Sequence, residues 1–564
     1  MRRRIIVTAI VAFAIALSLR VMNASFAELS PVDELYHLKR MTHFVDFDAD
    51  RDAFCPWPPL YDRAFGGLAR ILGATTQAEV LARVRWFPPL FFSLFVALAF
   101  VWMERRFGLA AALAATAALA ASPFIVTLSW VASIDHHWTE PIFVFAILAC
   151  VIDRRPLLLA LALTAAMFVQ TALLVAAALA FVILFFTTDG RAGAIAFSIP
   201  AVAIALYRAT RPPGYPDNAW FLGWTHAALF GAAAVACAFL AWAKGPLPAR
   251  GERVPPQAAG EGRHPADIAP HPALRATFSP QAGRRPFIFA LLAGACVVLA
   301  TPSAPAALLG GSRFFGGERW LETIVEFQPL WKAHGEDLLS IGVGLGAGAL
   351  LVWRLRNSVA AFAILYLLLT ITSRRFWSVG IPLLAIAGGI AAANIVWPRL
   401  RLLALVAVGV VPAVQLALWM TYRAPPVTDA FAPWFRAARF LHGQPPGRTL
   451  APWSVGHLLD VDGGRAVVVD NFGTMPDQIA FERAHDAFLT THEDALARYC
   501  DANGIRFIVY ENPRGMRSAA RILGVDVPPK LATKTVWSRA FAGAPLHDFR
   551  RIYARDGLVI VERR

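Results

Sequence analysis

The sequence predicts a polytopic α-helical membrane protein with a C-terminal soluble α/β domain. Of its 564 residues, 57% are hydrophobic and 16% are charged, whereas soluble domains carry about 25% charged residues. Apolar runs of about 20 residues recur along the chain, and each is long enough to cross a hydrocarbon core roughly 30 Å thick. Most of the chain is therefore expected to lie in lipid.

Arginine-rich turns predict the order of the spans, because cytoplasmic loops retain Lys and Arg. The block 156–186 would be about 46 Å long as one helix, so two short spans broken near Gln170 are expected there. About thirteen transmembrane helices result. They are expected over residues 5–22, 86–103, 108–130, 139–152, the two halves of 156–186, 193–209, 219–243, 286–309, 338–354, 357–372, 377–397 and 400–421.

The domain division follows from composition. Residues 1–425 are predicted to form the transmembrane part, and residues 426–564 an extracytoplasmic α/β domain. The stretch 244–285 is rich in Pro, Gly, Ala and Arg and is expected to be a flexible cytoplasmic loop. Beyond residue 426, β-branched runs alternate with helix-like segments such as 493–500. The runs are Val467–Asp470, Phe507–Tyr510 and Leu558–Val561.

The net charge of +15 does not indicate a nucleic-acid partner. Lys and Arg retained on the cytoplasmic side explain such a charge in a membrane protein. The sequence has no basic soluble domain interleaved with aromatic residues, so binding to nucleic acid is not expected.

Three acidic segments follow apolar spans and are all predicted to lie on the outer side of the membrane. They contain Asp33 with His37, Asp135 with His137, and Glu326. Carboxylates together with imidazoles suit Mg²⁺ or Mn²⁺ with open water positions. Such a metal can neutralise a departing pyrophosphate, while a carboxylate activates the nucleophile. The pattern therefore indicates catalysis at the membrane surface.

Arg374 and Arg375 lie at the predicted outer end of the span 357–372, which violates the inside preference of arginine. The planar guanidinium fork suits phosphate oxygens, so a phosphate clamp is one interpretation. The other interpretation is that both arginine side chains merely extend to the membrane interface. Gln170 is expected to be a helix-packing residue rather than a ligand.

These segments resemble motifs of the oligosaccharyltransferase catalytic subunit, especially its archaeal and bacterial single-subunit members with the GT-C glycosyltransferase fold. Asp33-Glu-Leu-Tyr-His37 resembles the first-loop motif of that family. Asp135-His-His137-Trp-Thr-Glu140 resembles the second motif, and Thr-Ile-Val-Glu326 resembles the fifth external loop. Arg375-Phe376 resembles the arginine that meets the lipid-linked pyrophosphate. The resemblance covers essentially the whole chain.

The resemblance implies a role for each residue. Asp33, Asp135 and His137 would hold the metal. Asp33 and Glu326 would bind and activate the acceptor. The donor phosphate would be bound by Arg375, Arg374 and His37.

One motif departs from the family pattern. The external domain of the family opens with Trp-Trp-Asp-Tyr-Gly, which reads the Ser or Thr of the Asn-x-Ser/Thr acceptor. The matching stretch here is Pro452-Trp453-Ser454-Val455-Gly456-His457, so Ser454 replaces the Asp. A site built to bond a hydroxyl loses discrimination when its partner changes. Trp453, Ser454, Gly456 and His457 are therefore expected acceptor-recognition residues for a relaxed sequon or a different acceptor.

The sequence thus predicts a metal-dependent oligosaccharyltransferase in the cell membrane, with its active site on the extracytoplasmic side. It would move a glycan from a polyprenyl-(pyro)phosphate carrier to an acceptor, expected to be a protein asparagine. A lipid-linked-sugar glycosyltransferase acting on a lipid or polysaccharide is the alternative within the class. A transporter is the alternative of another class. Its coupling carboxylates would lie at mid-membrane, whereas the acidic residues here are predicted in loops.

Overall fold

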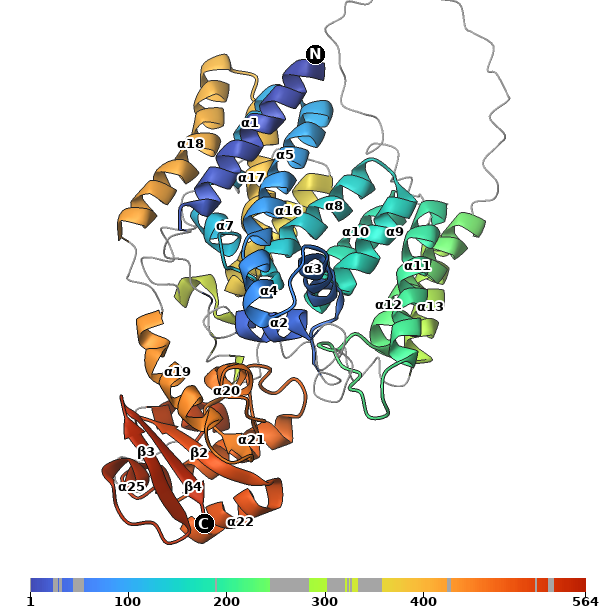
Figure 1. Cartoon of the computed structure of the whole chain (residues 1–564). Coiled ribbons are helices and arrows are strands. Elements are labelled where there is room, and N and C mark those ends of the chain that lie inside the picture. The colour runs from blue at the N-terminus through green and yellow to red at the C-terminus, as the bar shows by residue number, and fades with distance from the viewer. Residues whose placement is uncertain are drawn as a thin grey trace, which may run out of the picture.

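The computed structural model describes residues 2–23, 29, 33–43, 55–187, 190–243, 284–301, 320–321, 324, 327–332, 358–422, 428–512, 515–525 and 532–564. Glu326, the predicted span 338–354 and residues 244–283 of the predicted loop lie outside these residues. The described chain is mostly helical and ends in a small sheet at one end of the molecule (Figure 1).

Seventeen described helices precede the sheet, and short 3₁₀ turns join some of them. The turns that matter for the site are η1 (His136–Thr139), η2 (Thr171–Leu173) and η8 (Arg374–Phe376). The helices are α1 (Arg2–Val21), α2 (Asp33–Thr42), α3 (Leu60–Ile71), α4 (Gln77–Val84), α5 (Phe87–Phe107), α6 (Leu109–Ala121), α7 (Pro123–Leu128), α8 (Glu140–Ile152), α9 (Pro156–Met167), α10 (Leu174–Phe186), α11 (Gly190–Ala209), α12 (Trp224–Ala243), α13 (Arg284–Leu299), α16 (Ser358–Thr372), α17 (Trp377–Ala393), α18 (Pro398–Tyr422) and α19 (Thr428–His442).

Six helical segments in the described part of the chain are long and apolar enough to cross a membrane: Arg3–Val21, Gln77–Phe107, Gly190–Ala209, Trp224–Ala243, Arg374–Ala393 and Pro398–Thr421. Shorter apolar helices, among them α6, α9 and α16, pack beside them. The mostly helical, multi-pass architecture agrees with the prediction. The total of thirteen spans, the division at residue 425 and the side of the membrane stay predictions.

The predicted break near Gln170 is confirmed, because α9 ends at Met167 and η2 begins at Thr171. The predicted span 108–130, in contrast, is divided into α6 and α7. Pro123 has no N–H to bond the carbonyl of Leu119. The fully buried Arg20 of α1 donates to that carbonyl at 3.3 Å and to the carbonyl of Ala120 at 3.1 Å. A buried arginine thus satisfies the carbonyls that the break leaves open.

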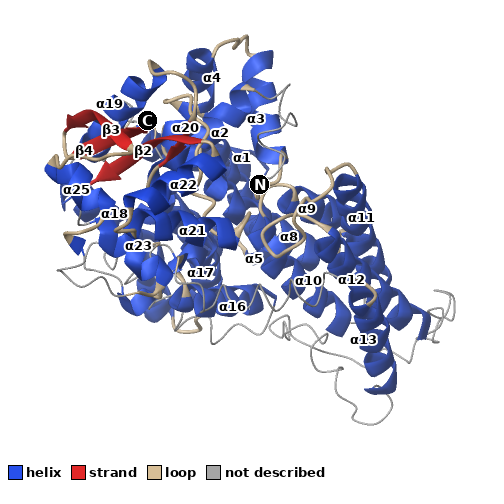
Figure 2. Ribbon diagram, turned by 90° about the horizontal axis from the view of Figure 1, so that it is seen from below, coloured by secondary structure: helices blue, strands red, loops and turns tan. Residues whose placement is uncertain are grey.

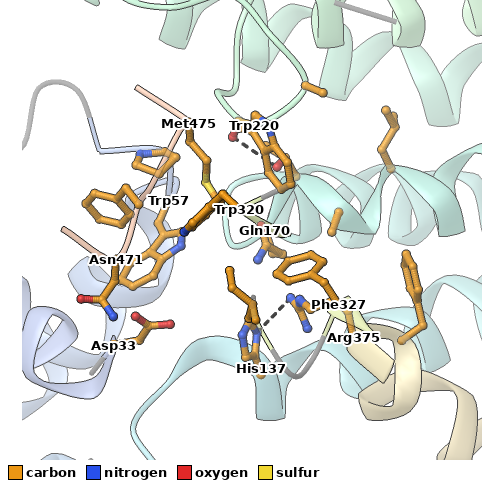
Figure 3. Close-up of a pocket in the computed structure, with 18 of the residues that line it drawn as sticks. Asp33, Trp57, His137, Gln170, Trp220, Trp320, Phe327, Arg375, Asn471 and Met475 are labelled. Carbon is orange, nitrogen blue, oxygen red and sulfur yellow. Dashed lines mark hydrogen bonds between the residues drawn. The ribbon is translucent and has the colours of Figure 1, made fainter. Parts of the chain in front are cut away.

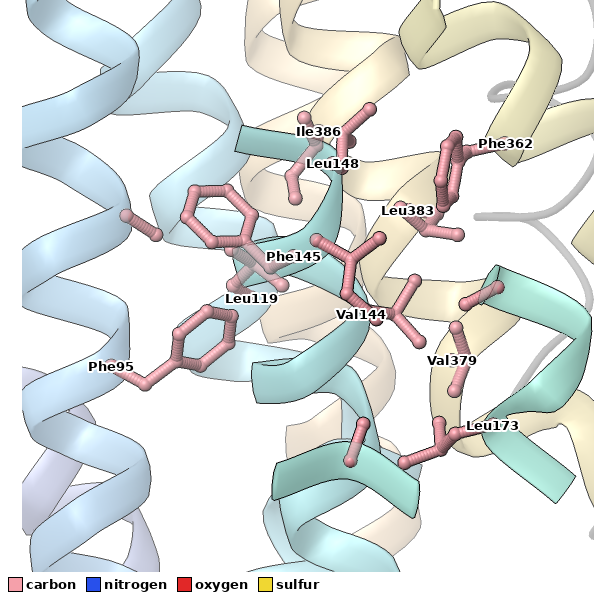
Figure 4. Packing of buried hydrophobic residues seen from close by; sticks show 14 of the residues in the cluster. Phe95, Leu119, Val144, Phe145, Leu148, Leu173, Phe362, Val379, Leu383 and Ile386 are labelled. Carbon is pink, nitrogen blue, oxygen red and sulfur yellow. The ribbon is translucent and has the colours of Figure 1, made fainter. Parts of the chain in front are cut away.

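The membrane part has a contiguous apolar core in which α8 lies between α5 and α6 on one side and α16 and α17 on the other (Figure 4). Side chains such as Phe145 and Leu148 of α8 fill that space and are buried. α6 and α17 approach closely, because a Cβ at Gly389 would lie 2.8 Å from the carbonyl oxygen of Ala111. Small residues at such crossings let membrane helices pack tightly. This packing fixes the position of α8, whose first turn carries site residues.

The C-terminal sheet has the strand order β1-β2-β4-β3, with β1 parallel to β2 and the other neighbours antiparallel. Helices lie around it, as Figure 2 shows. The predicted strand Val467–Asp470 is not formed, since only Val467 makes an isolated bridge, to Thr449. The elements are β1 (Arg448–Leu450), η9 (Trp453–Val455), α20 (Gly456–Val461), α21 (Gln478–Leu489), α22 (Glu493–Asn503), β2 (Ile505–Glu511), α23 (Met516–Leu523), α25 (Val536–Ala542), β3 (Phe549–Arg555) and β4 (Leu558–Arg563).

Candidate functional site

A cavity of about 530 Å³ lies where the membrane helices meet the C-terminal domain (Figure 3). Segments far apart in the sequence contribute to its wall, and much of that wall is aromatic. The residues that line it are Asp33, Pro56, Trp57, His137, Gln170, Thr171, Ala172, Leu174, Val175, Ala219, Trp220, Trp320, Ile324, Phe327, Arg375, Phe376, Trp453, Asn471, Phe472 and Met475.

The second acidic motif forms a turn that leads directly into α8. Asp135 has extended backbone before η1, and Glu140 then begins α8 with Pro141 in its first turn. Proline is favoured there because its missing N–H would have no helical partner. The turn directs His137 into the cavity, while Glu140 is buried behind it.

Arg375 is held by a dense set of polar contacts at the cavity wall. Its Nη2 lies 2.5 Å from Glu140 Oε1 and 3.0 Å from His137 Nδ1, and its Nη1 donates to Glu140 Oε2 at 3.3 Å. Ser378 Oγ donates to Glu140 Oε2 at 2.7 Å. All four side chains are buried or nearly so. The guanidinium is thus fixed by charge-assisted bonds, and Arg375 also lines the cavity.

His37 lies behind the cavity lining and is 1% exposed. Its Nδ1 is 2.6 Å from Asp62 Oδ1, and its Nε2 is 2.9 Å from His136 Nδ1. Its ring stacks on Trp57 at 4.4 Å between centroids. Burial lowers the pKa of His37, but Asp62 and Asp135 outweigh it and raise that pKa to about 9. Neighbouring carboxylates therefore favour positive charge at this position.

The structure brings together three residues that the sequence singled out, because Asp33, His137 and Arg375 line one cavity. Arg374 does not line it. The Arg374 backbone N–H donates to the carbonyl of Gln328 at 3.0 Å, and its guanidinium lies over the ring of Trp377. Glu326 lies outside the described residues, although its sequence neighbours Ile324 and Phe327 both line the cavity.

The expected acceptor-recognition stretch borders the same cavity. Trp453 lines it, whereas Ser454 is exposed, and its carbonyl accepts a long bond of 3.4 Å from Asn471 Nδ2. A Cβ at Gly456 would lie 2.4 Å from the Cα of Asp470, so only glycine fits there. His457 is fully buried and stacks on Tyr36 of α2 at 4.5 Å.

The C-terminal domain and α2 are also joined by an ion pair. Lys39 Nζ lies 2.5 Å from Asp460 Oδ2 of α20. His457 Nε2 is 3.9 Å from Asp33 Oδ1, at the start of α2. The helix that carries Asp33 and His37 is therefore seated on the C-terminal domain.

The described residues offer two groups of ligand atoms for a metal, His37 with Asp135 and His136, and His136 with His137 and Glu140. Asp33 belongs to neither group. Within the predicted set, Asp135 Oδ2 and His137 Nε2 are 3.4 Å apart. The buried Asp135 Oδ1 has no hydrogen bond in the described chain. Imidazole nitrogens beside such an oxygen fit a divalent cation.

Sequence reasoning missed several residues of the site. Asp62, which bonds His37, has no sequence signal, since it lies in an ordinary amphipathic helix. Gln170 was expected to pack helices, yet it lines the cavity and its Nε2 is 2.7 Å from His136 Nε2. The signal available in the sequence was that Gln170 is an isolated polar residue within the apolar block 156–186. No sequence motif pointed to three further lining residues, Trp57, Trp220 and Trp320.

The fold of this chain resembles that of solved structures, whereas its sequence matches no family model. No protein-family model matches the chain, and no curated protein matches it. Among solved structures, the Archaeoglobus fulgidus oligosaccharyltransferase in the apo form superposes with a TM-score of 0.75 at 14% identity, covering 98% of this chain and 80% of that one. The same values hold for archaeal oligosaccharyltransferase AglB from that organism in complex with an inhibitory peptide and a dolichol-phosphate.

A further structure of the Archaeoglobus fulgidus enzyme, tethered to an acceptor peptide containing the NVT sequon, superposes with a TM-score of 0.70 at 14% identity. It covers 98% of this chain and 79% of that one. At 14% identity, structural similarity establishes the fold alone. The activity has to be argued from the residues of the site. The family resemblance inferred from the motifs is thereby confirmed at the level of the fold: this chain has the architecture of the archaeal oligosaccharyltransferase.

Proposed function

We propose that this chain is a membrane glycosyltransferase of the oligosaccharyltransferase type. It transfers a glycan from a polyprenyl-(pyro)phosphate carrier to an acceptor, which we take to be an asparagine side chain of a polypeptide. The observation that carries the proposal is the convergence of Asp33, His137 and Arg375 from three distant segments on one cavity. The fold and the ligands named for the archaeal relatives, a dolichol-phosphate and an acceptor peptide, support it.

Arg375 binds the donor phosphate in this proposal. Glu140 and Ser378 hold the guanidinium in place, so little conformational entropy is lost when phosphate oxygens bind. Arg374, which does not line the cavity, and His37, which lies behind its lining, support the donor site by adding positive charge near it.

Asp33 and Glu326 activate the acceptor. The acceptor nitrogen attacks the anomeric carbon, a carbon–nitrogen bond forms, and the bond from that carbon to the phosphate oxygen breaks. The proton of the nitrogen passes to the carboxylate of Asp33, which acts as the general base. The lipid (pyro)phosphate leaves as an anion beside Arg375.

When bound, a divalent cation such as Mg²⁺ or Mn²⁺ would neutralise charge on that leaving group. Asp33, Asp135 and His137 are its proposed ligands, and the 3.4 Å separation of Asp135 Oδ2 from His137 Nε2 supports two of them. We place the protein in the cell membrane with this site on the extracytoplasmic side.

A lipid or polysaccharide acceptor is the second candidate. Trp57, Trp220, Trp320 and Trp453 line the cavity, and indole faces pack well on the apolar faces of sugar rings. Ser454, which stands where the family has Asp, also favours an acceptor without a sequon. In this case a hydroxyl oxygen replaces the amide nitrogen as the nucleophile.

The test is a transfer assay with the full chain purified in detergent. Labelled lipid-pyrophosphate glycan is the donor, and Asn-x-Thr peptide, Gln-x-Thr peptide and a saccharide are offered separately. We expect product on the Asn peptide, lost with chelator and in Asp33→Asn. Product on the saccharide alone would establish the second candidate. Donor cleavage without any gradient excludes the transporter, whereas a donor that is neither bound nor cleaved contradicts the proposal.

A further inference from the structure

Behind the cavity wall, two imidazoles and a carboxylate direct ligand atoms at one point. His37 Nε2 and His136 Nδ1 are 2.9 Å apart, and both side chains are 1% exposed. Asp135 Oδ1 lies 2.9 Å from His136 Nδ1 and 3.5 Å from His37 Nε2. That oxygen is buried and has no hydrogen bond in the described chain.

The outer nitrogen of His37 is held by an acceptor. Its Nδ1 lies 2.6 Å from Asp62 Oδ1, and Arg40 pairs with the other oxygen of Asp62 at 2.8 Å. A carboxylate at Nδ1 keeps a proton on that nitrogen, so a metal ion can replace the second proton, on Nε2, without loss of positive charge at this position. Histidines that bind metals in proteins are oriented by such a carboxylate.

The outer nitrogen of His136 is also occupied. The side-chain amide of Gln170 lies 2.7 Å from His136 Nε2. An amide presents oxygen or nitrogen at the same position after a half-turn, so Gln170 can accept the proton of Nε2. The lone pair of Nδ1 then points at His37. The two nitrogens and the carboxylate oxygen are held together by the proton on His37 Nε2 or by a cation that takes its place.

We propose that His37 Nε2, His136 Nδ1 and Asp135 Oδ1 bind a divalent transition-metal ion. Ligand atoms about 2.0–2.2 Å from Zn²⁺ are separated by about 3 Å at right angles and about 3.4 Å at the tetrahedral angle. The three measured separations, 2.9, 2.9 and 3.5 Å, fall at these values. Two imidazoles with one carboxylate favour Zn²⁺, Fe²⁺, Co²⁺ or Mn²⁺ over Mg²⁺, which prefers oxygen ligands.

This site differs from the one proposed at Asp33, Asp135 and His137, because it uses the other oxygen of Asp135. The alternative group of His136, His137 and Glu140 suits a cation poorly. The guanidinium of Arg375 already bonds Glu140 and His137 there. The inference goes beyond the proposed function, and metal binding is measured without glycan or acceptor, so either can fail alone.

The first experiment is X-ray absorption on the full chain in detergent, stripped with chelator and loaded with one equivalent of Zn²⁺. We expect scattering from two imidazoles, because His37 and His136 both bind the metal. A single imidazole is the result for the ligands Asp33, Asp135 and His137, and it would overturn the proposal. The measurement uses the unmodified protein, so it does not depend on whether a variant folds.

The second experiment compares Zn²⁺ dissociation constants of matched histidine variants. We expect His37→Ala and His136→Ala to bind at least tenfold more weakly, while His137→Ala and Asp33→Ala bind as the unmodified chain does. Asp62→Asn, which keeps all three ligands, should weaken binding by about 10–100-fold. Excess Mg²⁺ should not displace Zn²⁺. No Zn²⁺ binding, or binding that depends on His137 and Asp33 instead, contradicts the proposal.

Discussion

The two walls of the cavity differ in how their polar groups are satisfied. On the membrane side, Arg375, Glu140, His137 and Ser378 form short, mutually supporting bonds. On the side of the C-terminal domain, Asn471 makes bonds of 3.4 Å to the backbone around Ser454. In the described chain, His457 has no hydrogen bond at either ring nitrogen.

This difference shows where the molecule fixes its chemistry. A preorganised cationic site suits a phosphate, whose charge is the same for every glycan. The other wall is mainly aromatic and weakly bonded, so it selects a partner by shape and apolar contact. We call the membrane side the donor wall and the side of the C-terminal domain the acceptor wall. Substitutions in the donor wall should therefore impair stability and donor binding strongly. Substitutions in the acceptor wall should have small effects.

The largest effect is expected from Glu140→Ala. It leaves the guanidinium of Arg375 buried without its carboxylate, which typically costs about 3–5 kcal/mol. Donor affinity should fall as well, because Arg375 is no longer oriented. Thermal unfolding in detergent and donor binding measure the two effects.

A double variant separates charge from packing in the same place. Glu140→Leu with Arg375→Met should regain most of the stability, because both charges are gone, yet it should still not bind donor. A double variant as unstable as Glu140→Ala would mean that the pair itself holds the helices together.

Asp33→Asn should lower the turnover rate by about 10²–10⁴-fold, since a general base contributes that much. Donor binding should change much less, because Asp33 lies across the cavity from Arg375, which binds the donor phosphate in the proposal (Figure 3). Single-turnover rates and donor titration provide the measurement. A parallel loss of donor affinity would place Asp33 in the donor site.

Ser454→Asp restores a carboxylate at the exposed rim of the acceptor wall. If the acceptor is a sequon peptide, its KM should fall by about tenfold, as one charge-assisted hydrogen bond allows, with kcat unchanged. Peptides with Thr and with Ala at the third position provide the control. An equal change for both peptides would show that the hydroxyl is not read here.

The smallest effect is expected from His457→Phe. The phenyl ring keeps the stack on Tyr36, and the variant removes two buried nitrogens without hydrogen bonds. The free energy of unfolding should therefore change by less than about 1 kcal/mol. A larger loss would mean that a water or another group bonds His457. Calorimetry of the two proteins side by side decides the matter.

The sequence by itself determined the features that depend on local order. Hydropathy runs identify membrane helices because a span must cover the hydrocarbon core. Asp135, His137 and Glu140 are close because one turn and the start of α8 join them. The helix break at Gln170 follows from the length of the apolar block and the polar residue within it.

Only the tertiary structure decided contacts between residues distant in the chain. Asp62 contacts His37, and Gln170 contacts His136. Arg20 bonds the carbonyls before Pro123. Each contact exists because the packing of the helices brings side chains from distant segments to the same place. The run Val467–Asp470 has strand-like residues but lacks a neighbour along its length, so it forms only a bridge. Such outcomes depend on which surfaces meet, and a linear pattern does not contain that information.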